Sequence, residues 1–321
     1  MGYQIELDED VRSAIARCST EQLDRAVQEL SEGTGEDPVK AVHSARKAIK
    51  KERSLLRLVR GAVPAKQRRR ENTALREAAR GLSDARDAEV MIDTLDDLSE
   101  RYVGQVPEAA FDAIRPQLEQ TRDERRAHLL ASALGNRAVQ ELGTVKARSE
   151  TWKLNGDGWE ALAGGLTRAY ADGRSAFARA RTDRTSETWH AWRKRVKDLW
   201  YQERLLAGVC GPATRGQAKD AGDLSDLLGD DHDLGVLRAA LVEGRVRAPA
   251  DLDAIVALID HRRRELQAEA LHLGGRIYAE KPKAFVRRME RAWAAGRARA
   301  AAQSEDHPSE LAAATRVPHP A

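Results

Sequence analysis

This 321-residue chain contains an internal repeat, which limits the folds that it can adopt. Residues His43–Lys50 follow the pattern H-x-x-R-K-x-x-K, and His190–Lys197 follow it again 147 residues later. The same offset relates Arg57 to Arg204. A long motif that recurs at a fixed offset indicates duplication of one structural unit.

The repeat continues beyond these motifs. Arg86-Asp87 in the first half matches His232-Asp233 in the second at an offset of 146, a slip of one residue. We therefore predict two copies of one unit, about 1–150 and 151–301. The remaining residues, 302–321, contain three prolines and little apolar material, and we predict that this tail is disordered.

The composition favours helices, because Ala, Leu, Arg and Glu are abundant and β-branched residues are few. Apolar residues recur with helical spacing and show no sustained strand alternation, so the sequence predicts an all-α fold. The predicted helical segments are Glu9–Leu30, Val39–Val63, Lys66–Arg80, Leu82–Arg101, Pro107–Leu142, Trp159–Arg181, Ser186–Ala207, Thr214–Glu243, Ala250–Tyr278 and Pro282–Ala300.

Charge and apolar content exclude several classes of protein. No run of about 18 apolar residues is present, so we expect no transmembrane helix, and the acidic start of the chain is unlike a secretory signal. Cys18 and Cys210 are too few for a disulfide scaffold or a four-cysteine zinc site, so we expect a cytoplasmic protein. No glycine-rich phosphate loop followed by Lys-Ser/Thr is present, and we expect no cofactor. The net charge of +3 argues neither for nor against a polyanionic partner, so only the placement of the charges can decide this point.

Each repeated motif places cations along one face of a predicted helix. The first face carries His43, Arg46, Lys47, Lys50, Arg53 and Arg57. The second carries His190, Arg193, Lys194, Lys197, Tyr201 and Arg204. Like charges three and four residues apart repel each other, and an anionic ligand would offset that cost in both copies.

Simpler interpretations stay open for individual residues. A charge run is often a solvated helix face, and either histidine could be a helix–helix contact. Asp87 and Asp233 could orient neighbouring cations or act as general bases. His232-Asp233 also permits a metal-dependent phosphohydrolase, although Arg86 at the matching position cannot bind a metal. Trp189, Trp192 and Trp200 could stack on bases or belong to the core.

With these motifs in hand, the chain resembles the CHAD domain, the conserved histidine α-helical domain. The segment from Val42-His43 to Arg57 is similar to the first signature of that family, and His190–Lys197 followed by Tyr201 is similar to the second. Tyr170-x-x-Gly173-Arg174 and the segment Glu280–Phe285 also look like family sequence. The resemblance covers residues 5–301.

The resemblance implies two pseudo-symmetric four-helix-type bundles around a central basic channel that binds inorganic polyphosphate without catalysis. Arg76, Arg86 and His232 join the two basic faces as implied ligand-binding residues. The family is often fused to a triphosphate-tunnel domain, whose Glu-x-Glu-x-Lys strand is missing here, so we expect no hydrolysis from this chain. Arg53 in the first copy corresponds to Trp200 in the second, so the two walls of the channel would differ.

Three functional hypotheses follow. The first is a non-enzymatic polyphosphate-binding protein, with recruitment to polyphosphate granules as one role. The second is a nucleic-acid-binding module that uses the same groove. The third is a phosphohydrolase that uses His232, Asp233 and a divalent metal.

Overall fold

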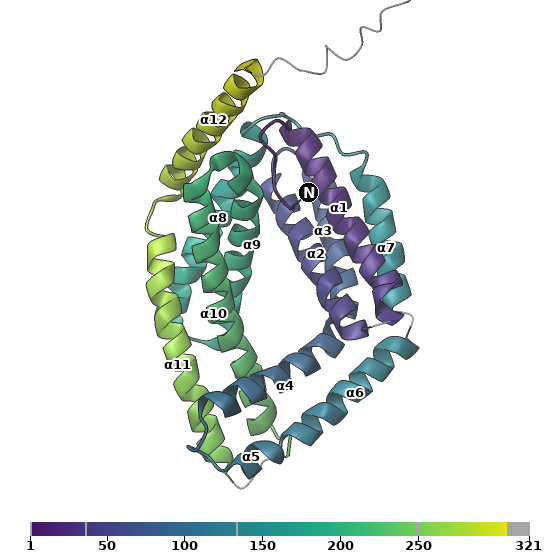
Figure 1. The fold of residues 1–321 in the computed structure, drawn as a ribbon, viewed down its shortest axis with the longest axis vertical. Coiled ribbons are helices and arrows are strands. Elements are labelled where there is room, and N and C mark those ends of the chain that lie inside the picture. Colours follow the sequence, from purple (N-terminus) through teal and green to yellow (C-terminus); the bar gives the residue numbers. More distant parts are fainter. Residues whose placement is uncertain (1, 36, 133, 248–250, 307–321) are drawn as a thin grey trace, which may run out of the picture.

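Helices and short turns make up the described part of the chain, residues 2–35, 37–132, 134–247 and 251–306 of a computed structural model (Figure 1). No strand is present in these residues, as the all-α prediction requires. The elements of the first half are α1 (Val11–Ser31), η1 (Gly33–Gly35), α2 (Pro38–Leu58), α3 (Ala65–Gly81), α4 (Ser83–Arg101), α5 (Glu108–Asp112), α6 (Arg115–Ala131) and α7 (Leu134–Ser149). Those of the second half are α8 (Glu160–Asp183), α9 (Ser186–Cys210), α10 (Pro212–Val242), α11 (Leu252–Ile277) and α12 (Pro282–Asp306).

The two halves present their helices in a similar order. The motif helices α2 and α9 each follow a long helix, α1 and α8 respectively. The pair α3 and α4 in the first half takes the place of the single 31-residue helix α10 in the second. Each half then closes with a helix near its end, α7 and α12.

Local sequence explains how the motif helices begin and end. The Asp37 carboxylate accepts from the backbone N–H groups of Val39 and Lys40, which caps α2 just before Pro38 in its first turn. Thr185 and Thr188 form a reciprocal capping box at the start of α9. Gly211, with a φ of 83°, ends α9 and is followed by Pro212 at the start of α10.

Three predicted boundaries differ from the structure. The segment predicted as one helix over 39–63 ends at Leu58, because the chain turns at Gly61, whose φ is 108°, ahead of Pro64. The segment predicted over 107–142 is divided among α5, α6 and α7, with Pro116 in the first turn of α6. At the C-terminal end, α12 continues to Asp306, into the predicted tail; the rest of that tail lies outside the described residues.

Both apolar cores contain side chains from both halves. The larger one consists mainly of residues of α1, α2, α3 and α7 packed on α8, α9 and α12, with a few from α6, α10 and α11. The smaller one joins α4, α5 and α6 to α10 and α11. Burying these side chains stabilises the contact between the halves as well as each half.

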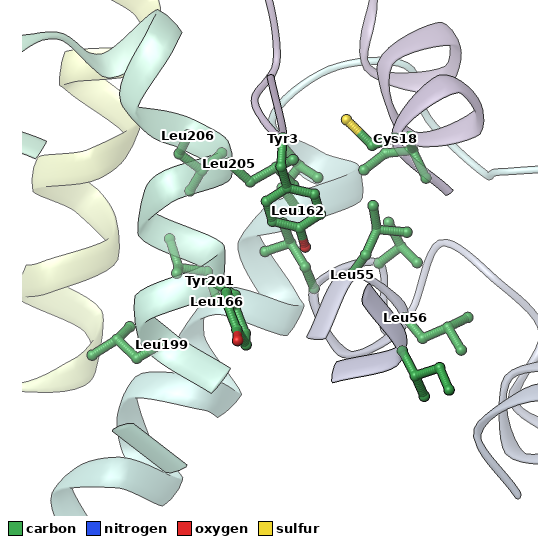
Figure 2. Packing of buried hydrophobic residues seen from close by; sticks show 14 of the residues in the cluster. Tyr3, Cys18, Leu55, Leu56, Leu162, Leu166, Leu199, Tyr201, Leu205 and Leu206 are labelled. Carbon is green, nitrogen blue, oxygen red and sulfur yellow. The ribbon is translucent and has the colours of Figure 1, made fainter. Parts of the chain in front are cut away.

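The N-terminal segment adds to the contact between the halves. Its Tyr3 ring lies between leucines of α9 and of α2 (Figure 2). The Tyr3 hydroxyl donates to the Lys51 carbonyl of α2 at 2.9 Å, and the Ile5 N–H donates to the Leu205 carbonyl of α9 at 2.8 Å. The segment therefore ties the two motif helices together.

A glycine sets the distance between α8 and the end of α2. A Cβ atom built on Gly165 would lie 1.8 Å from the carbonyl oxygen of Leu58, which is backbone and cannot swing away. We expect Gly165→Ala to destabilise the protein by about 1–3 kcal/mol, because the two helices would have to move apart. The adjacent Gly164→Ala is the control: its Cβ would lie 3.5 Å from the nearest heavy atom, so thermal unfolding should show little loss. Equal unfolding of the two variants would contradict the close contact.

Candidate functional site

A cavity of about 520 Å³ lies between the two motif helices and is completed by α3, α4 and α10. Along α2 the lining positions are four, three and four residues apart, which places them on one face of the helix. Ten Lys and Arg residues and three carboxylates line this space. The lining consists of Arg46, Lys50, Arg53, Arg57, Arg76, Arg86, Asp87, Val90, Met91, His190, Arg193, Lys194, Arg195, Lys197, Asp198, Tyr201, His232, Asp233 and Val236.

The structure brings most of the predicted ligand-binding residues to this cavity, together with the predicted orienting carboxylates Asp87 and Asp233. Three predicted ligand-binding residues are outside its lining. Lys47 is an exposed residue of α2. Arg204 lies over the Trp200 ring, 5.4 Å from its centroid. His43 is part of a neighbouring pocket and contacts the cavity through another residue.

That contact is made with Arg86, whose Nε donates to His43 Nδ1. The matching pair in the second half, His190 and His232, stacks with ring centroids 4.4 Å apart. In the sequence repeat, His43 corresponds to His190 and Arg86 to His232. In each half, the two residues at these positions contact each other. In the first half, the histidine of α2 therefore positions a cavity-lining arginine of α4.

The histidines are neutral at physiological pH. Burial, followed by the positive charge of Arg86, lowers the pKa of His43 to about 4. Burial and then His232 lower the pKa of His190 to about 4, and burial and then Arg193 do the same to His232. A neutral imidazole can accept a hydrogen bond at one nitrogen and donate at the other, so it can still contact an anion.

The cavity lysines show how strongly the positive charges act on each other. Burial, followed by the charges of Lys197 and Arg46, lowers the pKa of Lys50 to about 7. Burial and then Arg193 lower the pKa of Lys197 to about 8. A bound polyanion would favour the charged forms of both lysines, so the cavity suits an anionic ligand.

This crowding predicts that Lys50 destabilises the free protein. We expect Lys50→Met to raise the stability at pH 7 by about 1–3 kcal/mol, because a buried ammonium among like charges is removed. The unfolded chain binds more protons at Lys50 between pH 7 and 10.5, so wild-type stability from this group rises with pH across that window. The gain from the variant should therefore be largest below pH 7 and disappear towards pH 10.5.

Thermal unfolding in the absence of any polyanion measures this effect. Lys47→Met is the control, because Lys47 is exposed on the same helix. If Lys50→Met lowered the melting temperature at pH 7, the charge crowding in the cavity would be disproved.

Two charged lining residues, Arg195 and Asp198, were not identified as site residues from the sequence, and neither were the apolar Val90, Met91 and Val236. Asp198 of α9 accepts from Arg57 of α2 at 2.9 Å and pairs with Arg195 at 3.3 Å. Its backbone carbonyl also accepts from the Ser54 hydroxyl at 2.9 Å, so this part of α9 is fixed against α2. Arg195 points away from the basic face on a helical wheel, and only its long side chain brings its guanidinium to the cavity.

The tryptophans of the second motif belong mainly to the core. Trp189 and Trp192 are buried and pack against each other, with ring centroids 5.6 Å apart. Trp200 is half-buried under Arg204. None of the three lines the cavity. The metal-site interpretation of His232-Asp233 finds no support in the described ranges, where no group of three or more His, Cys, Asp or Glu residues could hold a metal ion.

An all-helical protein that gathers cations from two repeated helices into one cavity has the features of an anion-binding protein. Comparison with protein families then places it: residues 17–242 match the model of the CHAD domain, and the chain belongs to that family. Within the described part of the chain, no helix is both long and apolar enough to cross a membrane.

Solved structures show the same fold. PptA from Streptomyces chartreusis matches with a TM-score of 0.61 at 16% sequence identity, over 85% of this chain and 100% of that one. The CHAD domain from the plant Ricinus communis matches with a TM-score of 0.57 at 18% identity, over 98% of this chain and 96% of that one. A search among curated proteins found no match.

Proposed function

We propose that this protein binds inorganic polyphosphate in the cavity between α2 and α9 and does not hydrolyse it. The observation that carries the proposal is the convergence of ten Lys and Arg side chains, from both halves, on one cavity with three carboxylates. Polyphosphate carries about one negative charge per phosphate and no bases. Arginine forks and lysine ammonium groups bind its oxygens well.

The composition of the lining supports polyphosphate over nucleic acid. Single-stranded nucleic acids are usually held by aromatic side chains on which the bases stack. In this cavity, Tyr201 is the one Phe, Tyr or Trp residue among the lining residues, and Trp189 and Trp192 are packed in the core. The cavity therefore offers charge to a backbone and little stacking surface to a base.

The arrangement of acids and histidines supports binding over catalysis. His232 stacks on His190, and within the described residues no group of three or more His, Cys, Asp or Glu side chains could hold a metal ion. Asp233 lies close to Arg193 and Arg86, which lower its pKa, although burial outweighs them and raises it. These contacts suit an orienting carboxylate in a basic site.

In a cell, such a protein would be recruited to polyphosphate granules.

A titration with long-chain polyphosphate, followed by a phosphate-release assay on the same mixture with and without Mg²⁺, tests this function. We expect saturable binding and no release above the protein-free control. Metal-dependent release that is lost in Asp233→Ala would instead establish the phosphohydrolase.

A further inference from the structure

A second hollow lies between α8 and α9 and adjoins the cavity. This α8–α9 groove has a volume of about 480 Å³ and is lined by Arg168, Asp172, Ser175, Ala176, Arg179, Ala191, Lys194 and Arg195. Lys194 and Arg195 line the cavity as well, so the two spaces meet at these residues. The groove is therefore a continuation of the basic site.

The groove is positively charged along its length. Arg168, Asp172, Ser175 and Arg179 recur at helical spacing on one face of α8, and the small side chains of Ala176 and Ala191 leave the hollow open. Its four cations face one carboxylate, Asp172, which pairs with Arg168 at 2.9 Å. Arg195 also pairs with Asp198 of the cavity at 3.3 Å. With four cations and one carboxylate in its lining, the groove still has an excess of positive charge for a ligand.

The charges of the groove and of the cavity act on the same lysine. Burial, followed by the charges of Arg195 and Arg53, lowers the pKa of Lys194. Arg53 lines only the cavity, whereas Arg195 lines both spaces. The positive potential is thus continuous from one space to the other.

A pocket between α4 and α10 also adjoins the cavity, through Arg86, Val90 and Asp233, and its charge is opposite. Five carboxylates and three arginines line it. Burial and then neighbouring carboxylates raise the pKa of Asp93 and of Asp230, as expected for crowded acids. A third adjoining pocket, which contains His43, has three acids and three Lys or Arg residues. The α4–α10 pocket would therefore repel a polyanion, and the pocket that contains His43 would not attract one.

We propose that a polyphosphate chain too long for the cavity leaves it through the α8–α9 groove, where Arg168 and Arg179 bind its continuing part. This inference rests on the proposed function and specifies the side on which a long chain leaves the cavity. Binding of short polyphosphate depends on the cavity alone, whereas binding of long polyphosphate depends on the cavity and the groove together.

Calorimetric titrations with tripolyphosphate and with long-chain polyphosphate test the inference. The groove variant is R168Q/R179Q, which removes two charges from an exposed face of α8. The matched control is R101Q/R262Q, which removes two arginines from the α4–α10 pocket. Thermal unfolding checks that both variants fold. We expect the groove variant to bind long chains about tenfold more weakly and tripolyphosphate with unchanged affinity, because two phosphate contacts are lost. The control variant should bind both ligands as wild type does.

Wild-type affinity of the groove variant for long chains would overturn the inference. A larger loss in the control variant, or an equal loss for both ligands in the groove variant, would overturn it as well. Failure of the proposed function looks different, because the wild-type protein would then bind neither ligand.

Discussion

Removal of two cations from each motif helix is expected to lower the affinity for long-chain polyphosphate by about a thousandfold, because four charge-assisted contacts of about 1 kcal/mol each are lost. The variant replaces Arg46, Lys50, Arg193 and Lys197 by alanine. All four side chains line the cavity, two on each motif helix. Titration calorimetry measures the affinity, and circular dichroism checks that the helices are retained.

The control variant has the same change in net charge at exposed positions outside the cavity. It replaces Lys66, Lys153, Arg291 and Arg299 by alanine. We expect it to bind within a few-fold of wild type, because distant surface charges are screened by salt. Should the two quadruple variants lose the same affinity, the protein would bind polyanions through its overall charge, and the cavity would not be the site.

Salt is expected to weaken binding steeply. If about six phosphates are neutralised, the logarithm of the affinity should fall with a slope of about −4 against the logarithm of salt concentration, by analogy with single-stranded nucleic acids. A fourfold increase in salt would then weaken binding by roughly 300-fold. The slope should become shallower by about 3 in the cavity quadruple variant, because four of its cations are absent. A flat salt dependence would contradict binding through the cations.

The internal repeat is the part of the sequence from which most of the candidate site could be predicted. A histidine and cations in the same register on two helices, 147 residues apart, predicted an anionic ligand for both faces. That the two faces line one channel followed from the repeat symmetry together with the resemblance to the CHAD domain. The structure places Arg46 and Lys50 of one face opposite Arg193 and Lys197 of the other, around one cavity. Arg86 and His232, which correspond in the repeat, also make corresponding contacts, because each contacts the histidine of its own motif helix.

Other parts of the site depend on tertiary contacts that helical periodicity does not contain. A helical wheel gives the direction of a side chain and not its reach, so it misses Arg195, which lines the cavity, and includes Arg204, which turns to Trp200. The role of Asp198 in the site depends on its ion pair with Arg57 of the other half, at 2.9 Å, which the local sequence does not reveal. The breaks within 107–142 were missed because Pro116 is tolerated in a first helical turn and so does not by itself mark a helix start.

Competition between polyphosphate and single-stranded DNA of matched charge tests whether the cavity is specific for polyphosphate. Both ligands offer phosphates, but only DNA carries bases, for which the cavity lining provides little stacking surface. Wild-type protein, pre-loaded with labelled long-chain polyphosphate, is titrated with the DNA and, in parallel, with unlabelled polyphosphate. We expect the unlabelled polyphosphate to displace the label at a concentration at least about 100-fold lower, as for ligands that differ by about 3 kcal/mol. Displacement by DNA at an equal concentration would contradict the account and identify a general polyanion-binding protein.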